Sequence, residues 1–438
     1  MDFGTRVPQL LLSHPTVRRV ELTGSRAGGS TTPLSDWDFA VETNDFRALA
    51  VALPELVAPL EPLAEQWDPL AERATYMLML SGPMKVDLIF VREAFEKRLP
   101  WEVGPDTLAA IDEHFWDWIL WLAAKRARER DSLVRAELEK MHGFLLAPLG
   151  AESVPTTLDE AVAAYLSSSA KAERRLAHGV PKELRHEVLP ALSEDQRAGA
   201  AGTSVHVRCW GEPEAPPVLC WHGVNLTSPG SLRFAEAGPL LASRGLRVLA
   251  LDAPGFGGSP QQEPPGYHPH ALADLVPPLL DALELERVGF VGYSWGGDVG
   301  CHVAARHADR ITALVLLDAG YSDPPFDPNL PYEVYVEREA EVARELDGVT
   351  VSPQVVAAIE HGIAQALPST TRPQLAASRV PVLLVAAAAA SEENLTRFTR
   401  DVPQAEVLRP ERVGHDVFGD GGPPVVLAVA DWLRERAT

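Results

Sequence analysis

Apolar and polar residues alternate with different periods along the chain. In about the first 100 residues, segments short enough for β-strands alternate with helical ones, and the strand-like segments are 19–23, 37–42, 76–80 and 85–91. The last two flank Ser81-Gly82-Pro83, a turn-forming cluster that predicts a β-hairpin. We therefore expect a small α/β sheet over residues 1–105.

From Asp106 the pattern changes to the spacing of helices. Apolar residues fall on one face of a helix at Phe115, Trp118, Ile119 and Leu122, and a second helical pattern follows at Leu133, Leu138, Met141 and Leu145. This spacing predicts three or four helices packed around their own core. The small residues of 198–203 favour a flexible linker, so we place a helical bundle and linker over 106–200.

Beyond residue 200, apolar segments rich in β-branched residues recur between helical ones. They are residues 218–221, 248–252, 288–293, 313–318 and 382–386. This alternation predicts a mainly parallel sheet covered by helices over 201–438. A Pro-rich stretch with two amphipathic helical patterns interrupts the alternation, which we interpret as a small helical lid at about 321–380.

Composition narrows the possible partners. The 438 residues include 39 Lys and Arg against 61 Asp and Glu, a formal net charge of −22, and 46% of them are hydrophobic. Polyanions are bound chiefly by dense positive charge, so we expect neither nucleic acid nor a membrane as a partner. Small-molecule substrates remain, and the sequence leaves the oligomeric state open.

Cysteine usage and apolar run lengths indicate the compartment. Cys209, Cys220 and Cys301 show no paired metal-ligand spacing and cannot form an even disulfide framework. The first fifteen residues lack the pattern of a secretory signal, and no apolar stretch is long enough for a membrane span. We expect a cytoplasmic protein.

The N-terminal region contains carboxylates at a spacing that suits a divalent cation. Asp36 and Asp38 lie two residues apart and would project from one face of a strand, and Asp87 could join them from a neighbouring strand. Mg²⁺ prefers such oxygen ligands together with substrate phosphates, and the Gly24-Ser25 turn offers backbone donors to a triphosphate. Lys85 and Arg26 could offset phosphate charge.

These residues resemble the nucleotidyltransferase superfamily that includes minimal nucleotidyltransferases and DNA polymerase β. The family pattern of Gly-Ser, Asp-x-Asp and a third acid on a later strand matches Gly24, Ser25, Asp36, Asp38 and Asp87. The resemblance covers the first 100 residues, or 180 with the helices. It implies Mg²⁺-dependent transfer of a nucleoside monophosphate from an NTP to a small acceptor.

The C-terminal region contains a strand-turn-helix motif that suits a nucleophile. Gly292-Tyr-Ser-Trp-Gly296 follows an apolar strand, and its glycines relieve crowding in a sharp turn that exposes the Ser294 hydroxyl. His415 is the expected base. Trp295 N–H and Val224 N–H, the latter after His222-Gly223, are the expected oxyanion-hole donors.

The acid that orients His415 has more than one candidate. Asp318 ends the strand-like segment 313–318, whereas the loop after segment 382–386 offers only Glu392 and Glu393. We favour Asp318 and keep both glutamates as alternatives.

Residues 204–438 resemble the α/β-hydrolase superfamily. Besides the elbow at Ser294, they contain His222-Gly223, the turn 252–259, the strand end 316–320 and Gly414-His415 in the superfamily's order. The resemblance implies an acyl-enzyme serine hydrolase of esters or related acyl compounds that needs no cofactor. Serine at 294 argues against the Asp-nucleophile epoxide hydrolases and dehalogenases.

The two resemblances predict a two-module enzyme in which a nucleotidyltransferase activity could accompany the hydrolase, making the chain bifunctional. In the alternatives, nucleotidyl transfer is the main activity, or the N-terminal module is a degenerate binding domain that regulates the hydrolase.

Overall fold

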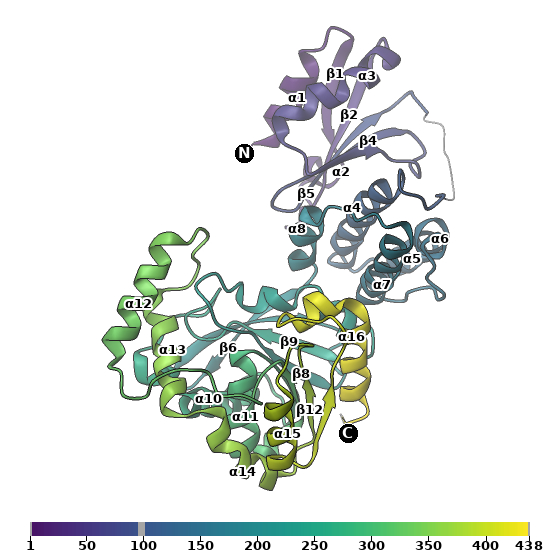
Figure 1. The fold of residues 1–438 in the computed structure, drawn as a ribbon. Helices are drawn as coiled ribbons and strands as arrows, with labels where there is room; N and C mark the ends of the chain where they lie inside the picture. Colours follow the sequence, from purple (N-terminus) through teal and green to yellow (C-terminus); the bar gives the residue numbers. More distant parts are fainter. Residues whose placement is uncertain (1, 95–100, 437–438) are drawn as a thin grey trace. The chain divides into compact units, whose positions relative to one another are not determined.

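The computed structural model describes residues 2–94 and 101–436, and the chain divides into two compact units (Figure 1). The units are Met1–Leu192 and Ser193–Thr438, so the division precedes the predicted boundary near residue 200. Each unit has its own buried apolar cluster.

The N-terminal unit begins with a five-stranded mixed sheet of order β1-β2-β5-β4-β3. Its strands are β1 (Val17–Thr23), β2 (Trp37–Thr43), β3 (Ala64–Trp67), β4 (Ala74–Leu80) and β5 (Met84–Phe90), and its helices are α1 (Phe3–Leu12), α2 (Gly24–Ala27) and α3 (Phe46–Val57). Strands β4 and β5 form the predicted hairpin, and β2 lies parallel to β5. This parallel pairing places Asp38 opposite Asp87.

Helices follow the sheet, as the spacing predicted. They are α4 (Leu108–Arg126), α5 (Asp131–Met141), the π-helical turn His142–Leu146, α6 (Ala147–Leu149), α7 (Leu158–Leu176) and α8 (Glu183–Ala191). Phe115, Ile119 and Leu122 of α4 are fully buried, and Leu138 of α5 is as well. The Thr157 hydroxyl caps α7 by accepting the Glu160 N–H at 3.1 Å.

The predicted linker at 198–203 is wrong. Strand β6 (Glu194–Ala200) pairs antiparallel with β7 (Thr203–Trp210), and the small residues form the hairpin between them. Ala201 and Gly202 both have positive φ, which a tight hairpin turn requires and which explains the glycine. Ala198 and Ala200 are buried, so their small side chains serve packing.

The C-terminal unit is built on an eight-stranded sheet of order β13-β12-β11-β10-β8-β9-β7-β6. Beyond β6 and β7 the strands are β8 (Pro217–Trp221), β9 (Arg247–Leu251), β10 (Val288–Tyr293), β11 (Ile311–Leu317), β12 (Val382–Val385) and β13 (Ala405–Leu408). Strands β8 to β13 are paired in parallel, as predicted, whereas β7 lies antiparallel to β9. The carboxyl ends of the parallel strands therefore meet at one edge.

Helices cover this sheet (Figure 1). They are α9 (Ala237–Ala242), α10 (Pro269–Ala282), α11 (Trp295–Arg306), α12 (Tyr332–Glu345), α13 (Pro353–Gln365), α14 (Pro368–Ser378), α15 (Glu392–Asp401) and α16 (Val417–Arg434). Helices α12 to α14 occupy the segment interpreted as a lid. Ile359 of α13 and Leu375 of α14 join the apolar cluster of the sheet, whereas α12 buries Tyr335. Within the described residues, no helix is long and apolar enough to cross a membrane.

Candidate active site and candidate metal centre

Ser294 occupies the sharp turn between β10 and α11. Its backbone has φ 53° and ψ −125°, a strained conformation for a non-glycine residue. Side chains cannot be tolerated two residues before or two residues after Ser294, because a Cβ at Gly292 would lie 2.4 Å from Gly296 O and a Cβ at Gly296 would lie 2.3 Å from Trp221 O. The two glycines therefore permit the turn that presents the hydroxyl.

A chain of hydrogen bonds joins Ser294, His415 and Asp318. His415 Nε2 lies 3.0 Å from Ser294 Oγ, and His415 Nδ1 lies 2.7 Å from Asp318 Oδ2. With the proton on Nδ1, the ring donates to the carboxylate and presents Nε2 as acceptor to the serine hydroxyl. These are the three residues singled out from the sequence, and they come from the ends of β10 and β11 and from the loop before α16.

The Asp318 carboxylate is held by several donors. Its Oδ1 accepts the Ala387 N–H and the Tyr321 hydroxyl, each at 2.9 Å. Burial opposes ionisation, but the hydrogen bonds from His415, Ala387 and Tyr321 outweigh it and lower the pKa of Asp318 below its ordinary value. The carboxylate is thus charged at neutral pH beside the imidazole.

The alternative acids take other positions. Glu392 begins α15 and forms an ion pair with Arg409. Both glutamates are exposed, and among the described residues no hydrogen bond joins Glu392 or Glu393 to His415. Asp318 is therefore the acid that the fold brings to the imidazole.

The expected oxyanion loop lies directly against the nucleophile. A Cβ added at Gly223 would lie 3.1 Å from Ser294 Cβ, so Gly223 passes beside the serine, and Trp295 begins α11 immediately after it. His222 is fully buried; its Nδ1 lies 2.7 Å from Gly223 O and its Nε2 accepts the Ala253 N–H at 3.0 Å. Burial lowers the pKa of His222, so the neutral ring bridges the two turns.

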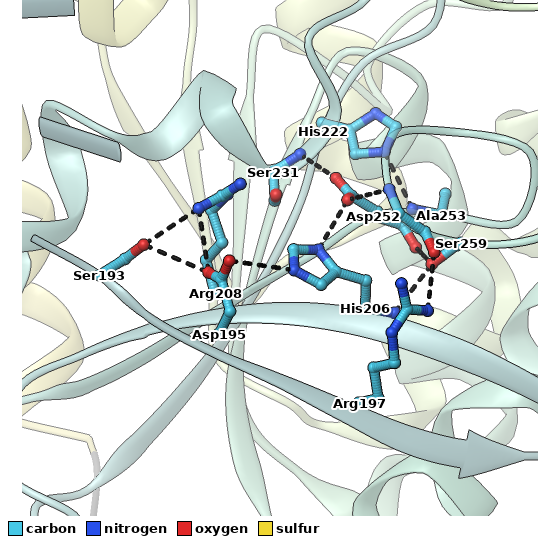
Figure 2. A network of polar contacts seen from close by, with 11 residues as sticks. Ser193, Asp195, Arg197, His206, Arg208, His222, Ser231, Asp252, Ala253 and Ser259 are labelled. Carbon is cyan, nitrogen blue, oxygen red and sulfur yellow. Dashed lines mark hydrogen bonds and ion pairs between the residues drawn. The ribbon is translucent and has the colours of Figure 1, made fainter. Parts of the chain in front are cut away.

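Figure 2 shows the polar network that fixes these turns. The Asp252 carboxylate accepts the Ser231 N–H at 2.6 Å and the Gly258 N–H at 2.8 Å, and it lies 2.8 Å from His206 Nδ1. Burial raises the pKa of Asp252, but these donors outweigh burial and lower it overall. Asp195 of β6 lies 3.6 Å from the other nitrogen of His206, so the edge hairpin is tied to the network.

In the N-terminal unit, the three predicted carboxylates converge. Asp36, Asp38 and Asp87 each offer an oxygen within 4.8 Å of the others, the only such group of potential ligands within the described parts of the chain. Asp36 and Asp87 are buried. Gly24 has φ +65°, and a Cβ there would lie 1.9 Å from Asp38 Oδ2, so only glycine fits against this carboxylate.

Two of these acids, Asp38 and Asp87, resist ionisation. Burial raises the pKa of Asp87 to about 8, with Lys85 opposing the shift and Asp117 adding to it. Burial and Asp36 likewise raise the pKa of Asp38. Like charges this close favour a shared cation or proton. The Ser25 hydroxyl is buried and has no hydrogen-bond partner among the residues that the structure describes.

The two candidate phosphate-facing cations have protein partners instead. Lys85 is buried, with its Nζ 2.7 Å from Asp117 Oδ2 and 3.3 Å from Asp87 Oδ2. Arg26 donates to the carbonyls of Ser35 and Asp36 and lies 4.2 Å from the ring centre of Trp37. Both side chains are therefore occupied within the fold.

Comparison with known proteins supports the predicted fold of the C-terminal unit. A family model described as the alpha/beta hydrolase fold matches residues 216–354. Epoxide hydrolase A of Mycobacterium tuberculosis is 35% identical over 151 residues, covering 32% of this chain and 46% of that protein. The 2-hydroxymuconate semialdehyde hydrolase of a Pseudomonas species is 32% identical over 142 residues, covering 31% and 46%.

Among solved structures, the enol-lactonase from Burkholderia xenovorans is similar to 54% of this chain, with 99% of its own chain covered, 24% identity and a TM-score of 0.46. The chain spans about half the length of the two curated relatives. The C-terminal unit has an α/β-hydrolase fold, as its motif order predicted.

Sequence reasoning missed residues around both the candidate metal centre and the candidate active site. Asp117 was assigned no role beside Asp87, and neither Asp298 nor Arg372 was related to Asp318. Asp298 follows the elbow by four residues, a position in the first turn of a helix where an acid is ordinary. The pattern alone carried no signal that would distinguish it.

Proposed function

We propose that the C-terminal unit is a serine hydrolase that cleaves esters or related acyl compounds. The observation that carries this function is the hydrogen-bonded chain from Ser294 through His415 to the ionised Asp318. A hydroxyl becomes an effective nucleophile when a positioned base takes its proton, and the carboxylate stabilises the imidazolium that forms.

The reaction proceeds in two halves. Ser294 Oγ attacks the acyl carbon while His415 Nε2 takes the hydroxyl proton, and the N–H groups of Trp295 and Val224 stabilise the oxyanion. The intermediate collapses to an acyl-enzyme as His415 returns the proton to the leaving alkoxide. A water molecule, deprotonated by His415, then attacks the ester of Ser294 and releases the acid, restoring the serine.

Labelling by a fluorophosphonate tests the nucleophile. Ser294→Ala should abolish labelling and the turnover of p-nitrophenyl acetate, while Ser378→Ala, a serine at the end of α14, should leave both intact. Equal labelling of the Ser294→Ala variant would exclude the assignment.

The acid is tested by a matched pair. Asp318→Asn should lower kcat by about 10³- to 10⁴-fold, because the amide no longer stabilises the imidazolium. Glu392→Gln should leave kcat within about twofold, since Glu392 pairs with Arg409. A large loss of kcat in Glu392→Gln, with little loss in Asp318→Asn, would instead assign the role of the acid to Glu392.

The convergent carboxylates favour a second function for the N-terminal unit. There we infer Mg²⁺-dependent transfer of a nucleoside monophosphate from an NTP to a small acceptor. Asp36, Asp38 and Asp87 would hold the cation, and Gly24 and Ser25 would face the phosphates. The bound ion would supply charge stabilisation for phosphoryl transfer.

A cavity of about 570 Å³ adjoins this cluster at Asp87 and suits the acceptor. Five acids line it, Asp68, Glu72, Asp87, Asp117 and Glu137, against the cations Lys85 and Lys140, and Trp118 and Trp121 add aromatic faces. Lys85 is already paired with acids of the lining, and Lys140 lies 2.6 Å from Glu137. The remaining negative charge and the indoles suit a cationic, hydroxylated acceptor.

Calorimetric titration with Mg²⁺ and ATP tests this function. Asp36→Asn should abolish magnesium-dependent ATP binding, whereas Asp131→Asn, at the start of α5, should retain it. Binding without any nucleotide transfer to a panel of amino-alcohol acceptors would instead favour a degenerate, regulatory module, and unchanged binding in Asp36→Asn would refute both.

A further inference from the structure

The backbone that carries Asp318 is strained and needs external support. Asp318 has φ 47°, in the left-handed region that non-glycine residues rarely adopt, and Gly320 follows with φ 75°. Such a conformation is unfavourable for a non-glycine residue and persists only where the surroundings determine it. The Asp318 N–H donates to Val385 O at 2.8 Å, which fixes one end of the turn.

The other end of the turn is held at Gly320 from two sides. The Asp298 carboxylate accepts the Gly320 N–H at 3.1 Å, and Arg372 Nη2 donates to the Gly320 carbonyl at 3.2 Å. A side chain is excluded there, since a Cβ would lie 2.8 Å from Cys301 Sγ. Both backbone polar groups of Gly320 are therefore hydrogen-bonded to side chains.

Asp298 and Arg372 are each tied to other parts of the C-terminal unit. Asp298 lies on α11, and its own N–H donates to Ser294 O at 3.2 Å. The first turn of this helix therefore carries both the nucleophile and the carboxylate that binds Gly320. Arg372 of α14 is 3% exposed, lies 3.4 Å from Asp401 and stacks 5.6 Å from the centre of the Phe398 ring.

We propose that Asp298 and Arg372 are positioning residues for the hydrolytic reaction, holding the turn 318–320 so that the Asp318 carboxylate faces His415. This rests on the proposed serine hydrolase function. Ser294 and Asp318 lie on different elements, and Asp298 links them because it belongs to the nucleophile's helix and binds the acid's turn. Arg372 extends the link to α14, within the segment interpreted as a lid.

The chemistry of Asp298 defines a conservative variant. Burial raises the pKa of Asp298 to about 7, with the Gly320 N–H opposing the shift. An asparagine keeps an oxygen that can accept the Gly320 N–H, so Asp298→Asn should retain this hydrogen bond. Asp298→Ala removes the acceptor and leaves the Gly320 N–H without its partner.

Steady-state kinetics with p-nitrophenyl acetate test the proposal. Asp298→Ala should lower kcat about 10- to 100-fold with KM within about twofold, because a misplaced acid impairs the chemical step rather than substrate binding. Asp298→Asn should stay within about threefold of wild type. As a matched control, Asp274→Ala removes a carboxylate that pairs with Arg306 at the other end of α11 and should leave kcat unchanged.

A double-mutant cycle separates positioning from a general structural role. In the Asp318→Asn background, adding Asp298→Ala should cause no further loss of kcat, since the acid it positions is already disabled. Arg372→Ala and Asp298→Ala should likewise combine to less than the product of their separate effects. An unaltered loss in the Asp318→Asn background would overturn the proposal.

Two outcomes distinguish this proposal from the function on which it rests. If Ser294→Ala retains turnover, the serine hydrolase assignment fails. If Ser294→Ala is inactive while Asp298→Ala keeps full kcat, only the positioning role fails. Should Asp298→Ala not fold, Arg372→Ala in the wild-type and Asp318→Asn backgrounds gives the same comparison, and equal losses in both would refute positioning.

Discussion

Glycines decide which side chains can approach one another at both sites. At Gly24 and Gly296 the absent Cβ leaves room for a carboxylate and for a backbone carbonyl, respectively. Gly24 combines a positive φ with this close approach, whereas Gly29 has φ +72° and, among the described residues, no atom within 4 Å of where its Cβ would lie. Gly24 begins α2 and Gly29 follows it, so substitutions at these two glycines separate backbone strain from steric collision.

This contrast gives a prediction at the scale of single residues. Gly24→Ala should weaken Mg²⁺ binding by more than about tenfold, because its methyl group would displace Asp38, while Gly29→Ala incurs only the strain of positive φ, roughly 1–2 kcal/mol. Calorimetric titration of each variant with Mg²⁺ is the measurement. Equal weakening in both variants would show that backbone strain, not contact with Asp38, accounts for the loss of Mg²⁺ binding.

At the scale of elements, periodicity predicted the hairpin β4–β5 and the parallel strands, because each repeats one apolar pattern over several residues. It failed at residues 198–203, where small residues suit a hairpin between packed strands as well as a linker. The strand β3 was missed because its sequence, Ala-Glu-Gln-Trp, lacks the run of apolar residues that marks the other strands. In the candidate active site, motif spacing predicted Ser294 and His415. The hydrogen bonds of Asp298 and Arg372 to Gly320 could not be predicted in this way, because they join elements far apart in sequence.

Helices α12 and α13 share a pair of acids whose ionisation should affect stability. Burial, with Glu339 of α12 adding to it, raises the pKa of Glu360 on α13 to about 7. The unfolded chain ionises glutamate near its ordinary pKa of about 4.3. Between these values the folded state holds a proton that the unfolded state has lost, so stability falls as pH rises through this window.

Glu360→Gln should remove the loss of stability that accompanies this rise in pH. We expect the variant to unfold at a temperature about 2 °C higher than wild type at pH 8, with the difference disappearing near pH 4.5. Glu341→Gln, on the exposed part of α12, is the control and should show no pH-dependent difference. A gain for Glu360→Gln at pH 4.5 as large as at pH 8 would contradict the assignment of the effect to ionisation.

At the scale of the whole molecule, each unit contains a buried apolar cluster within its described residues. Phe39, Leu88 and Phe90 belong to the cluster of the N-terminal unit, and Leu316 and Phe290 to that of the C-terminal unit. Since each cluster is completed by residues of its own unit, the cooperative unfolding of one does not require that of the other. We therefore expect the two units to unfold in separate transitions.

Differential scanning calorimetry tests this independence with one truncation in each core. Leu88→Ala and Leu316→Ala each remove a fully buried side chain, a change that costs about 2–5 kcal/mol. Each should lower one thermal transition by about 5–15 °C and leave the other in place, because at this size 1 kcal/mol corresponds to about 2–4 °C. Each variant serves as the control for the other. If either truncation lowered both transitions together, the units would fold as one cooperative body, and changes in the N-terminal unit would then affect the C-terminal unit through shared stability.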